Sequence, residues 1–144
     1  MGTFEIFDHT ADVGLIVRAA SLPDLLETAA RAAFGIMILD VPREVVKAEE
    51  VAVEVQKGLA DDLGELLVVW LQELLYRFEM GHWVPIRFAF EEAAAGRARA
   101  QVGFGRFDPK RDRTGPEVKA VTYHQLSVRH EPDGTWTARV ILDI

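Results

Sequence analysis

Apolar residues near the start of the chain follow first a strand pattern and then a helical one. Residues 4–7 and 13–19 are apolar enough for two short strands, with a polar insertion between them. Ser21 suits the N-cap of the next element, and Pro23 suits its first turn. We therefore expect a helix over residues 22–38, whose apolar face recurs at helical spacing: Leu22, Leu25, Leu26, Ala29, Ala33 and Ile36.

A second helix is predicted over residues 62–79, after a half-buried strand at 51–55 in which every second residue is valine. Gly81 follows the last apolar residues of this helix and is expected to end it. Its apolar residues occupy nearly every side rather than one stripe. A helix of this kind is usually covered on more than one face, so we expect it at the centre of the core.

The last third of the chain is predicted to be rich in strands, at residues 84–90, 97–106, 118–130 and 135–144. Asp133 and Gly134 form the dipeptide that favours a tight hairpin between the last two strands. This order of elements predicts an α+β layered fold and argues against a doubly wound parallel sheet. The chain of 144 residues, with no linker-like stretch, is expected to form one domain over residues 1–144.

Charge and composition narrow the possible partners. The formal net charge is −7, whereas proteins that bind RNA through its phosphates usually present a basic surface. One short basic stretch, Lys110 to Arg113, is interleaved with acids and is expected to be a solvated loop. Direct high-affinity binding of RNA is therefore disfavoured, and a basic protein partner suits the acidic chain better.

Several classes of protein are disfavoured by what the sequence lacks. There is no cysteine, which excludes disulfides, thiolate nucleophiles and zinc held by sulfur. No phosphate-binding loop is present, and the four histidines lack the spacing of a helical zinc site. The start of the chain does not resemble a signal peptide, so we expect a cytoplasmic location. No catalytic machinery is visible from residue spacing.

Three groups of residues are candidates for chemistry. Asp8, His9 and Asp12 gather between the first two strands and could bind a metal or act in acid–base catalysis, although turns are rich in aspartate for backbone reasons alone. Asp143 lies beside the terminal carboxylate of Ile144 at the end of an apolar strand. These two charges would repel each other unless a cation lay between them, and a divalent ion with oxygen ligands would resolve the conflict.

Lys119 belongs to the third group, at the entry to the strand predicted from residue 118. A lysine on an apolar strand face can simply extend its amine into water. The functional alternative is that Lys119 neutralises nearby acids or contacts a nucleotide phosphate.

Taken together, these segments resemble the archease family over essentially the whole chain and in the same order. The resemblance is carried by Phe7-Asp8-His9-Thr10-Ala11-Asp12-Val13-Gly14, by residues 25–30 and 34–37 of the first helix, by residues 62–63 and 70–76 of the second, by residues 117–124, and by the terminal Leu142-Asp143-Ile144.

The resemblance implies a fold, a partner and a metal. Archeases are described as cofactors of the RtcB-type RNA ligase of tRNA splicing, promoting its guanylylation and multiple turnover. The implied fold is a layered β/β/α sandwich with two main helices. The implied metal is divalent, most often calcium, and its ligands carried over to this sequence are Asp12, Asp143 and Ile144 through its terminal carboxylate. His9, Lys119 and, less directly, Glu27 would line the same functional surface.

Two other functions stay open at this point. The first is a general chaperone or modulator of RNA-processing proteins, in which the metal only supports the structure. The second is a small metal-dependent hydrolase that uses His9 beside the Asp12 site, which predicts slow turnover of a phosphoester by the isolated protein.

Overall fold

The computed structural model describes residues 2–9, 12–56 and 62–144. The chain begins with two strands, β1 (Thr3–His9) and β2 (Asp12–Ala19), followed by helix α1 (Leu22–Met37). The remaining elements are β3 (Lys47–Glu54), α2 (Asp62–Gly81), β4 (Trp83–Ala94), β5 (Arg97–Arg106), β6 (Ala120–Val121), β7 (Ser127–His130) and β8 (Trp136–Asp143).

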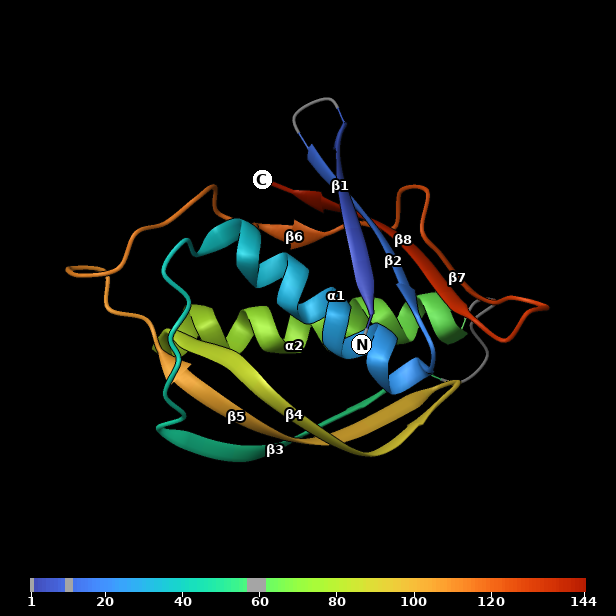
Figure 1. The fold of residues 1–144 in the computed structure, drawn as a ribbon, viewed down its shortest axis with the longest axis horizontal. Helices are drawn as coiled ribbons and strands as arrows, with labels where there is room; N and C mark the ends of the chain where they lie inside the picture. Colours follow the sequence, from blue (N-terminus) through green and yellow to red (C-terminus); the bar gives the residue numbers. More distant parts are fainter. Residues whose placement is uncertain (1, 10–11, 57–61) are drawn as a thin grey trace.

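These strands form two antiparallel sheets. In the first sheet the order is β1-β2-β8-β6, with β7 also paired to β8, so the last strand of the chain lies beside the second. The second sheet has the order β3-β5-β4. Because β8 pairs with β2, the first and last strands of the chain belong to the same sheet (Figure 1).

The two helices lie between the two sheets and contact both of them (Figure 1). Helix α1 contacts β2 on one side and β4 on the other, and α2 contacts β3 and β4 as well as β7. The predicted α+β fold with two sheets and two main helices is confirmed. The helices form the middle layer, and this order of layers differs from the β/β/α order that the resemblance implied.

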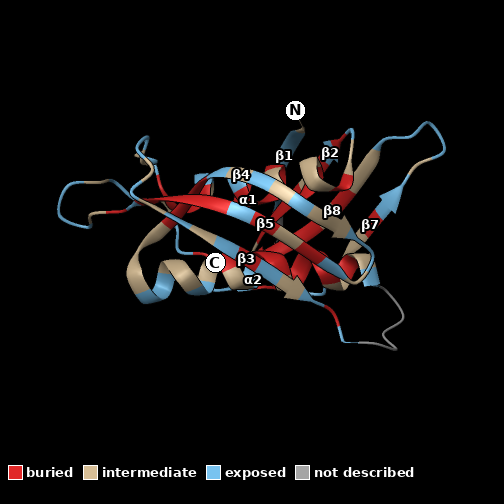
Figure 2. Ribbon diagram, turned by 90° about the horizontal axis from the view of Figure 1, so that it is seen from below, coloured by how far each residue is buried: buried red, intermediate tan, exposed pale blue. Residues whose placement is uncertain are grey.

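Helix α2 is central because its apolar residues cover most of its circumference. Trp70 is fully buried, and its indole N–H donates to the carbonyl of Leu26 in α1 at 2.9 Å. Phe90 in β4 contacts the same indole, with ring centroids 5.2 Å apart. Buried and exposed residues alternate along the strands of the second sheet (Figure 2), so one face of that sheet meets the helices and the other meets water.

Most predicted elements occur where the pattern placed them. The Ser21 side chain accepts a hydrogen bond from the backbone N–H of Asp24, which confirms the N-cap of α1. Gly134, with φ of 91°, lies in the turn between β7 and β8, as the Asp-Gly signal predicted. No helix in the described part of the chain is long and apolar enough to cross a membrane.

The single strand predicted over residues 118–130 is wrong, because this segment forms two short strands separated by a turn. The Thr122 hydroxyl donates to the carbonyl of Ile141 and accepts from the backbone N–H of His124. The turn then closes with Gln125 at φ of 55°. The backbone N–H of Thr122 also donates to the carbonyl of Ile141, and the chain then leaves β8 and pairs with it again from Ser127.

Candidate metal centre

Asp12 and Asp143 are direct partners in the antiparallel pairing of β2 with β8. Residues opposite each other in such a pair typically hold their Cβ atoms about 4.5–5.5 Å apart on the same face of the sheet. The fold therefore brings together two carboxylates from opposite ends of the chain.

This acid pair lies on the face of the sheet that points away from the helices. Val13 and Leu142 are the neighbours of the two acids, and both are buried on the inner face. Since side chains alternate along a strand, Asp12 and Asp143 point outward. Both acids are half-buried rather than freely exposed.

The same row of the sheet extends to residues on both flanks. His9 pairs in backbone register with Asp12, and Ala120 pairs with Asp143. The backbone N–H of Lys119 donates to the carbonyl of Asp143 at 2.7 Å. The backbone positions of His9, Asp12, Asp143 and Lys119 thus meet along one end of the sheet, although the side chain of His9 lies outside the described atoms.

Ile144 follows Asp143 as the last residue of the chain. Its side chain is half-buried and packs against the hydrophobic core. This packing holds the last residue against the core, next in the chain to Asp143.

The donor set fits a hard divalent cation. Carboxylate oxygens are the preferred ligands of Ca²⁺ and Mg²⁺, and two acids placed directly opposite each other destabilise a sheet unless a positive charge compensates them. Within the described residues, no three side chains of histidine, cysteine, aspartate or glutamate gather at one point. Among the described side chains, the candidate set therefore has two carboxylates, those of Asp12 and Asp143.

Glu27 does not join this group. It lies on α1, where its carboxylate accepts from the guanidinium of Arg31 at 3.0 Å. Arg31 in turn lies over the ring of Phe88 in the second sheet. Because α1 covers the inner face of the first sheet and the acid pair is on its outer face, β2 and β8 separate Glu27 from the pair.

An aromatic contact next to the acid pair was not predicted from the sequence. Phe7 is the cross-strand partner of Gly14, and its ring covers the position where a Cβ atom of residue 14 would lie. Arg139 places its guanidinium 4.4 Å from the centroid of the same ring and also donates to the side chain of Gln125. The glycine in the motif of residues 7–14 was the sequence signal for this close approach.

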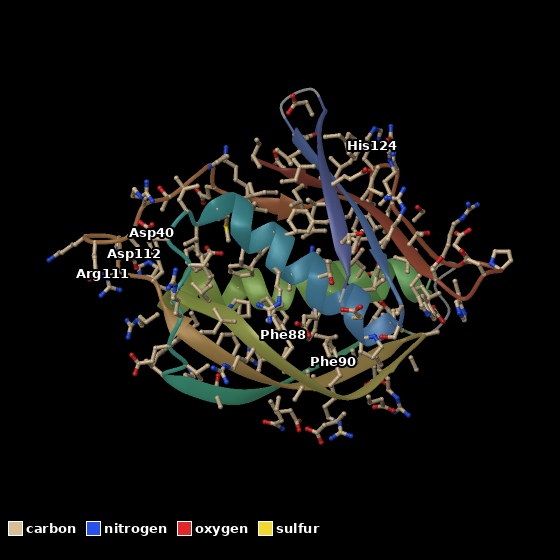
Figure 3. The ribbon with its side chains drawn as sticks, in the orientation of Figure 1. Asp40, Phe88, Phe90, Arg111, Asp112 and His124 are labelled. Carbon is tan, nitrogen blue, oxygen red and sulfur yellow. The ribbon has the colours of Figure 1, made fainter. Side chains whose placement is uncertain are left out.

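Ion pairs neutralise two of the cations between Lys110 and Arg113. Figure 3 shows Asp40, Arg111 and Asp112 near one another in this part of the protein. Arg113 forms a bidentate ion pair with Asp40, and Arg111 pairs with Asp112. The side-chain hydrogen bond from Arg113 lowers the pKa of Asp40 from 3.8 to about 2. Two of the cations in this loop thus already have acidic partners, which agrees with the prediction of a solvated loop of mixed charge.

Comparison with known proteins shows the family of the chain. A model of the Archease protein family matches residues 4–144. A protein named "Protein archease" from Methanopyrus kandleri is 38% identical to this chain, over 98% of this chain and 99% of the relative. Another, from Pyrococcus furiosus, is 34% identical over the full length of both chains. The solution structure of Methanobacterium thermoautotrophicum protein 1598 is 29% identical, with a TM-score of 0.77 over 98% of both chains. This chain belongs to the archease family.

Proposed function

We propose that this protein is a non-enzymatic activator of an RtcB-type RNA ligase, which promotes guanylylation and multiple turnover of that ligase in tRNA splicing in the cytoplasm. The family match over residues 4–144 supports the partner. The single structural observation that supports a site is the cross-strand pairing of Asp12 with Asp143 beside the end of the chain.

The proposed site uses Asp12, Asp143 and the terminal carboxylate of Ile144 to hold a divalent cation, most simply calcium. A calcium ion takes about six to eight oxygen ligands, so three carboxylates leave positions for water or for an oxygen of the partner. The acid pair lies on the outer face at the end of the sheet. A partner is proposed to approach it from this outer face.

Charge supports a protein partner over direct tRNA binding. The net charge of −7 repels phosphates, and Arg111 and Arg113 are already paired with acids. An acidic protein associates faster with a basic protein surface because complementary charges steer the encounter. His9 and Lys119, which flank the acid pair along the sheet, are proposed to contribute to the same contact surface.

The test is a guanylylation assay of the RtcB-type ligase under single and multiple turnover. The proteins compared are the unmodified chain, Asp143→Ala and a form extended by a few residues after Ile144. The extension moves the terminal charge away from Asp143 and should impair the site, whereas the same extension at the N-terminus should not. We expect stimulation of turnover by the unmodified chain and a loss of about tenfold or more in both site variants.

Each contrary outcome points to a different function. If the unmodified chain does not change guanylylation but binds several RNA-processing enzymes, the chain is a general modulator. If the isolated chain hydrolyses a phosphoester with a dependence on Asp12, it is a hydrolase. If Asp143→Ala loses the metal and stimulates the ligase fully, the metal serves the structure alone.

A further inference from the structure

A groove separate from the acid pair opens at the side of the molecule where both helices end. Two adjoining cavities, of about 360 and 270 Å³, share Met37, Phe78, His82 and Glu117 in their walls. Each of the two is close to the lower end of the range for small-ligand sites, roughly 300–1,000 Å³. The groove can therefore hold one large side chain.

The ends of the helices make this groove electronegative. Helix α1 ends at Met37 and α2 ends at Gly81, on the side where the chain of residues 107–119 passes (Figure 1). Neither helix, both of which are fully described, carries a basic residue in its last turn. Each helix C-terminus bears a partial negative charge of roughly half an electron, which a cation nearby would stabilise.

Two carboxylates reinforce this negative charge. Glu79, in the last turn of α2, and Glu117, in the segment before β6, both line the groove and are exposed to water. Lys119 is the one lysine or arginine among the lining residues that the structure describes. The walls of the groove thus carry a net negative charge.

The floor of the groove is aromatic. Phe78 contacts His82 and Phe107, with ring centroids 5.7 Å apart in both pairs. The backbone N–H of His82 donates to the carbonyl of Phe78, and the N–H of Phe107 donates to the carbonyl of His82, so these rings are held in place by main-chain hydrogen bonds. A planar cation such as guanidinium stacks on aromatic faces and also forms paired hydrogen bonds with carboxylates.

We infer that this groove receives an arginine side chain from the basic protein partner. The negative walls exclude phosphate groups and hence nucleic acid, while the aromatic floor favours arginine over the strongly hydrated amine of lysine. Lys119 lines this groove, and its backbone N–H donates to the carbonyl of Asp143, so an arginine bound here would place the partner at the same end of the first sheet as the acid pair. The identity of that partner as the RtcB-type ligase rests on the proposed function; the binding of arginine does not.

The test is an NMR titration of the full ¹⁵N-labelled chain with acetyl-Gly-Arg-Gly-amide. The matched probe replaces arginine by citrulline, which has nearly the same shape without the charge. We expect the arginine peptide to shift the amide signals of Phe78, His82 and Val118, and the citrulline peptide to leave them unchanged. Equal shifts with both peptides, or no shift in this region, would overturn the inference.

Two variants should change the affinity for the arginine peptide in opposite directions. Glu117→Gln should weaken binding of the arginine peptide roughly fivefold, the effect of removing one partly exposed ion pair. Lys119→Gln should strengthen binding by a similar factor because it removes the competing cation. Glu44→Gln, at an exposed position outside the groove, removes the same charge and should change nothing. If Glu117→Gln and Glu44→Gln weaken binding of the peptide equally, the affinity depends on net charge alone and the groove is not the binding site.

The outcome is separable from that of the proposed function because the titration contains no ligase. If the peptide binds as expected and the chain does not stimulate the RtcB-type ligase, the arginine site stands and its partner is another basic protein. If the ligase is stimulated and the peptide does not bind, the proposed function stands and the arginine site is refuted.

Discussion

Trp70 is the largest fully buried side chain among the described residues, and at the scale of a single residue it connects both helices with the second sheet. Its ring contacts Phe88 and Phe90 in the second sheet, while its indole N–H is hydrogen-bonded to the carbonyl of Leu26 in α1. A buried polar group that loses its partner costs free energy in addition to the lost packing. Trp70 therefore combines a large apolar surface with one specific polar contact.

Trp70→Phe should lower the free energy of unfolding by about 2–4 kcal/mol, because it leaves a cavity and removes the buried hydrogen bond to Leu26. Urea unfolding followed by circular dichroism would measure this change. The control is Trp136→Phe, since Trp136 is half-buried and stacks on exposed His130. A loss in Trp70→Phe no larger than that in the control would contradict the central role of this side chain.

At Gly14 the absence of a Cβ atom determines how the neighbouring strand packs. Its missing Cβ leaves room for the ring of Phe7, on which Arg139 packs. Gly14→Ala should destabilise the protein by roughly 1–3 kcal/mol because the ring must move aside. Urea unfolding measures this change, and Gly35→Ala is the control. A Cβ added at Gly35 on α1 meets open space and favours the helix. Equal effects of the two substitutions would show that Phe7 moves without cost.

At the scale of elements, an ion pair joins the chain after α1 to the segment between β5 and β6. The side chain of Asp40 accepts from the backbone and the guanidinium of Arg113, and the two segments also form a bridge between Ile38 and Thr114. The hydrogen bond from the Arg113 side chain is the largest cause of the lowered pKa of Asp40, which falls from 3.8 to about 2. This contact holds the outer wall of the groove against α1.

The contribution of this ion pair should depend on pH in a defined window. Because the pKa of Asp40 is lower in the folded state, its stabilising effect is fully present above an ordinary aspartate pKa of about 4 and is lost as the pH falls toward 2. The difference in urea midpoint between the unmodified chain and Asp40→Asn should be constant from pH 7 to 5 and shrink below pH 4. A difference that does not change between pH 5 and 2.5 would refute the assignment to this carboxylate.

At the scale of the whole molecule, the sheet joins residues separated by most of the chain. Asp12 and Asp143 meet because β8 pairs with β2, and the two carboxylates then lie on the same outward face. The stability of the folded protein should therefore respond to divalent cations, because an ion that binds only the folded state stabilises it by mass action.

Calcium at about 100 times its dissociation constant should raise the free energy of unfolding by roughly 2.7 kcal/mol in the unmodified chain, and EDTA should reverse the change. In Asp143→Asn this response should be lost. Thermal melts with and without calcium measure both effects.

Asp8→Asn is the matched control for the metal. Asp8 is in the same hairpin as Asp12 but pairs with Val13, whose side chain points to the inner face. Its substitution removes one negative charge near the site and should leave the response to calcium intact. If Asp8→Asn and Asp143→Asn lose the response equally, the cation is held by general negative charge and not by the acid pair.

The sequence by itself determined the features that depend on neighbours along the chain. Helix α1 was predicted at 22–38 and found at Leu22–Met37, because its N-cap and the spacing of its apolar face are local signals. The strand at Arg97–Arg106 and the Asp133-Gly134 hairpin were recovered for the same reason. The burial of α2 also followed from its composition, since a helix that is apolar nearly all round must be covered on several sides.

Only the tertiary structure decided what depends on contacts between distant segments. Residues 118–130 form β6 and β7 separated by a turn, and where each pairs with β8 is set by contacts between distant segments that no local pattern contains. The order of layers follows from which faces of the helices the two sheets cover. The pairing of Asp12 with Asp143, and the convergence of the two helix ends on the groove, arise from strand register and helix packing. These are set by burial of the whole core and not by neighbours in the sequence.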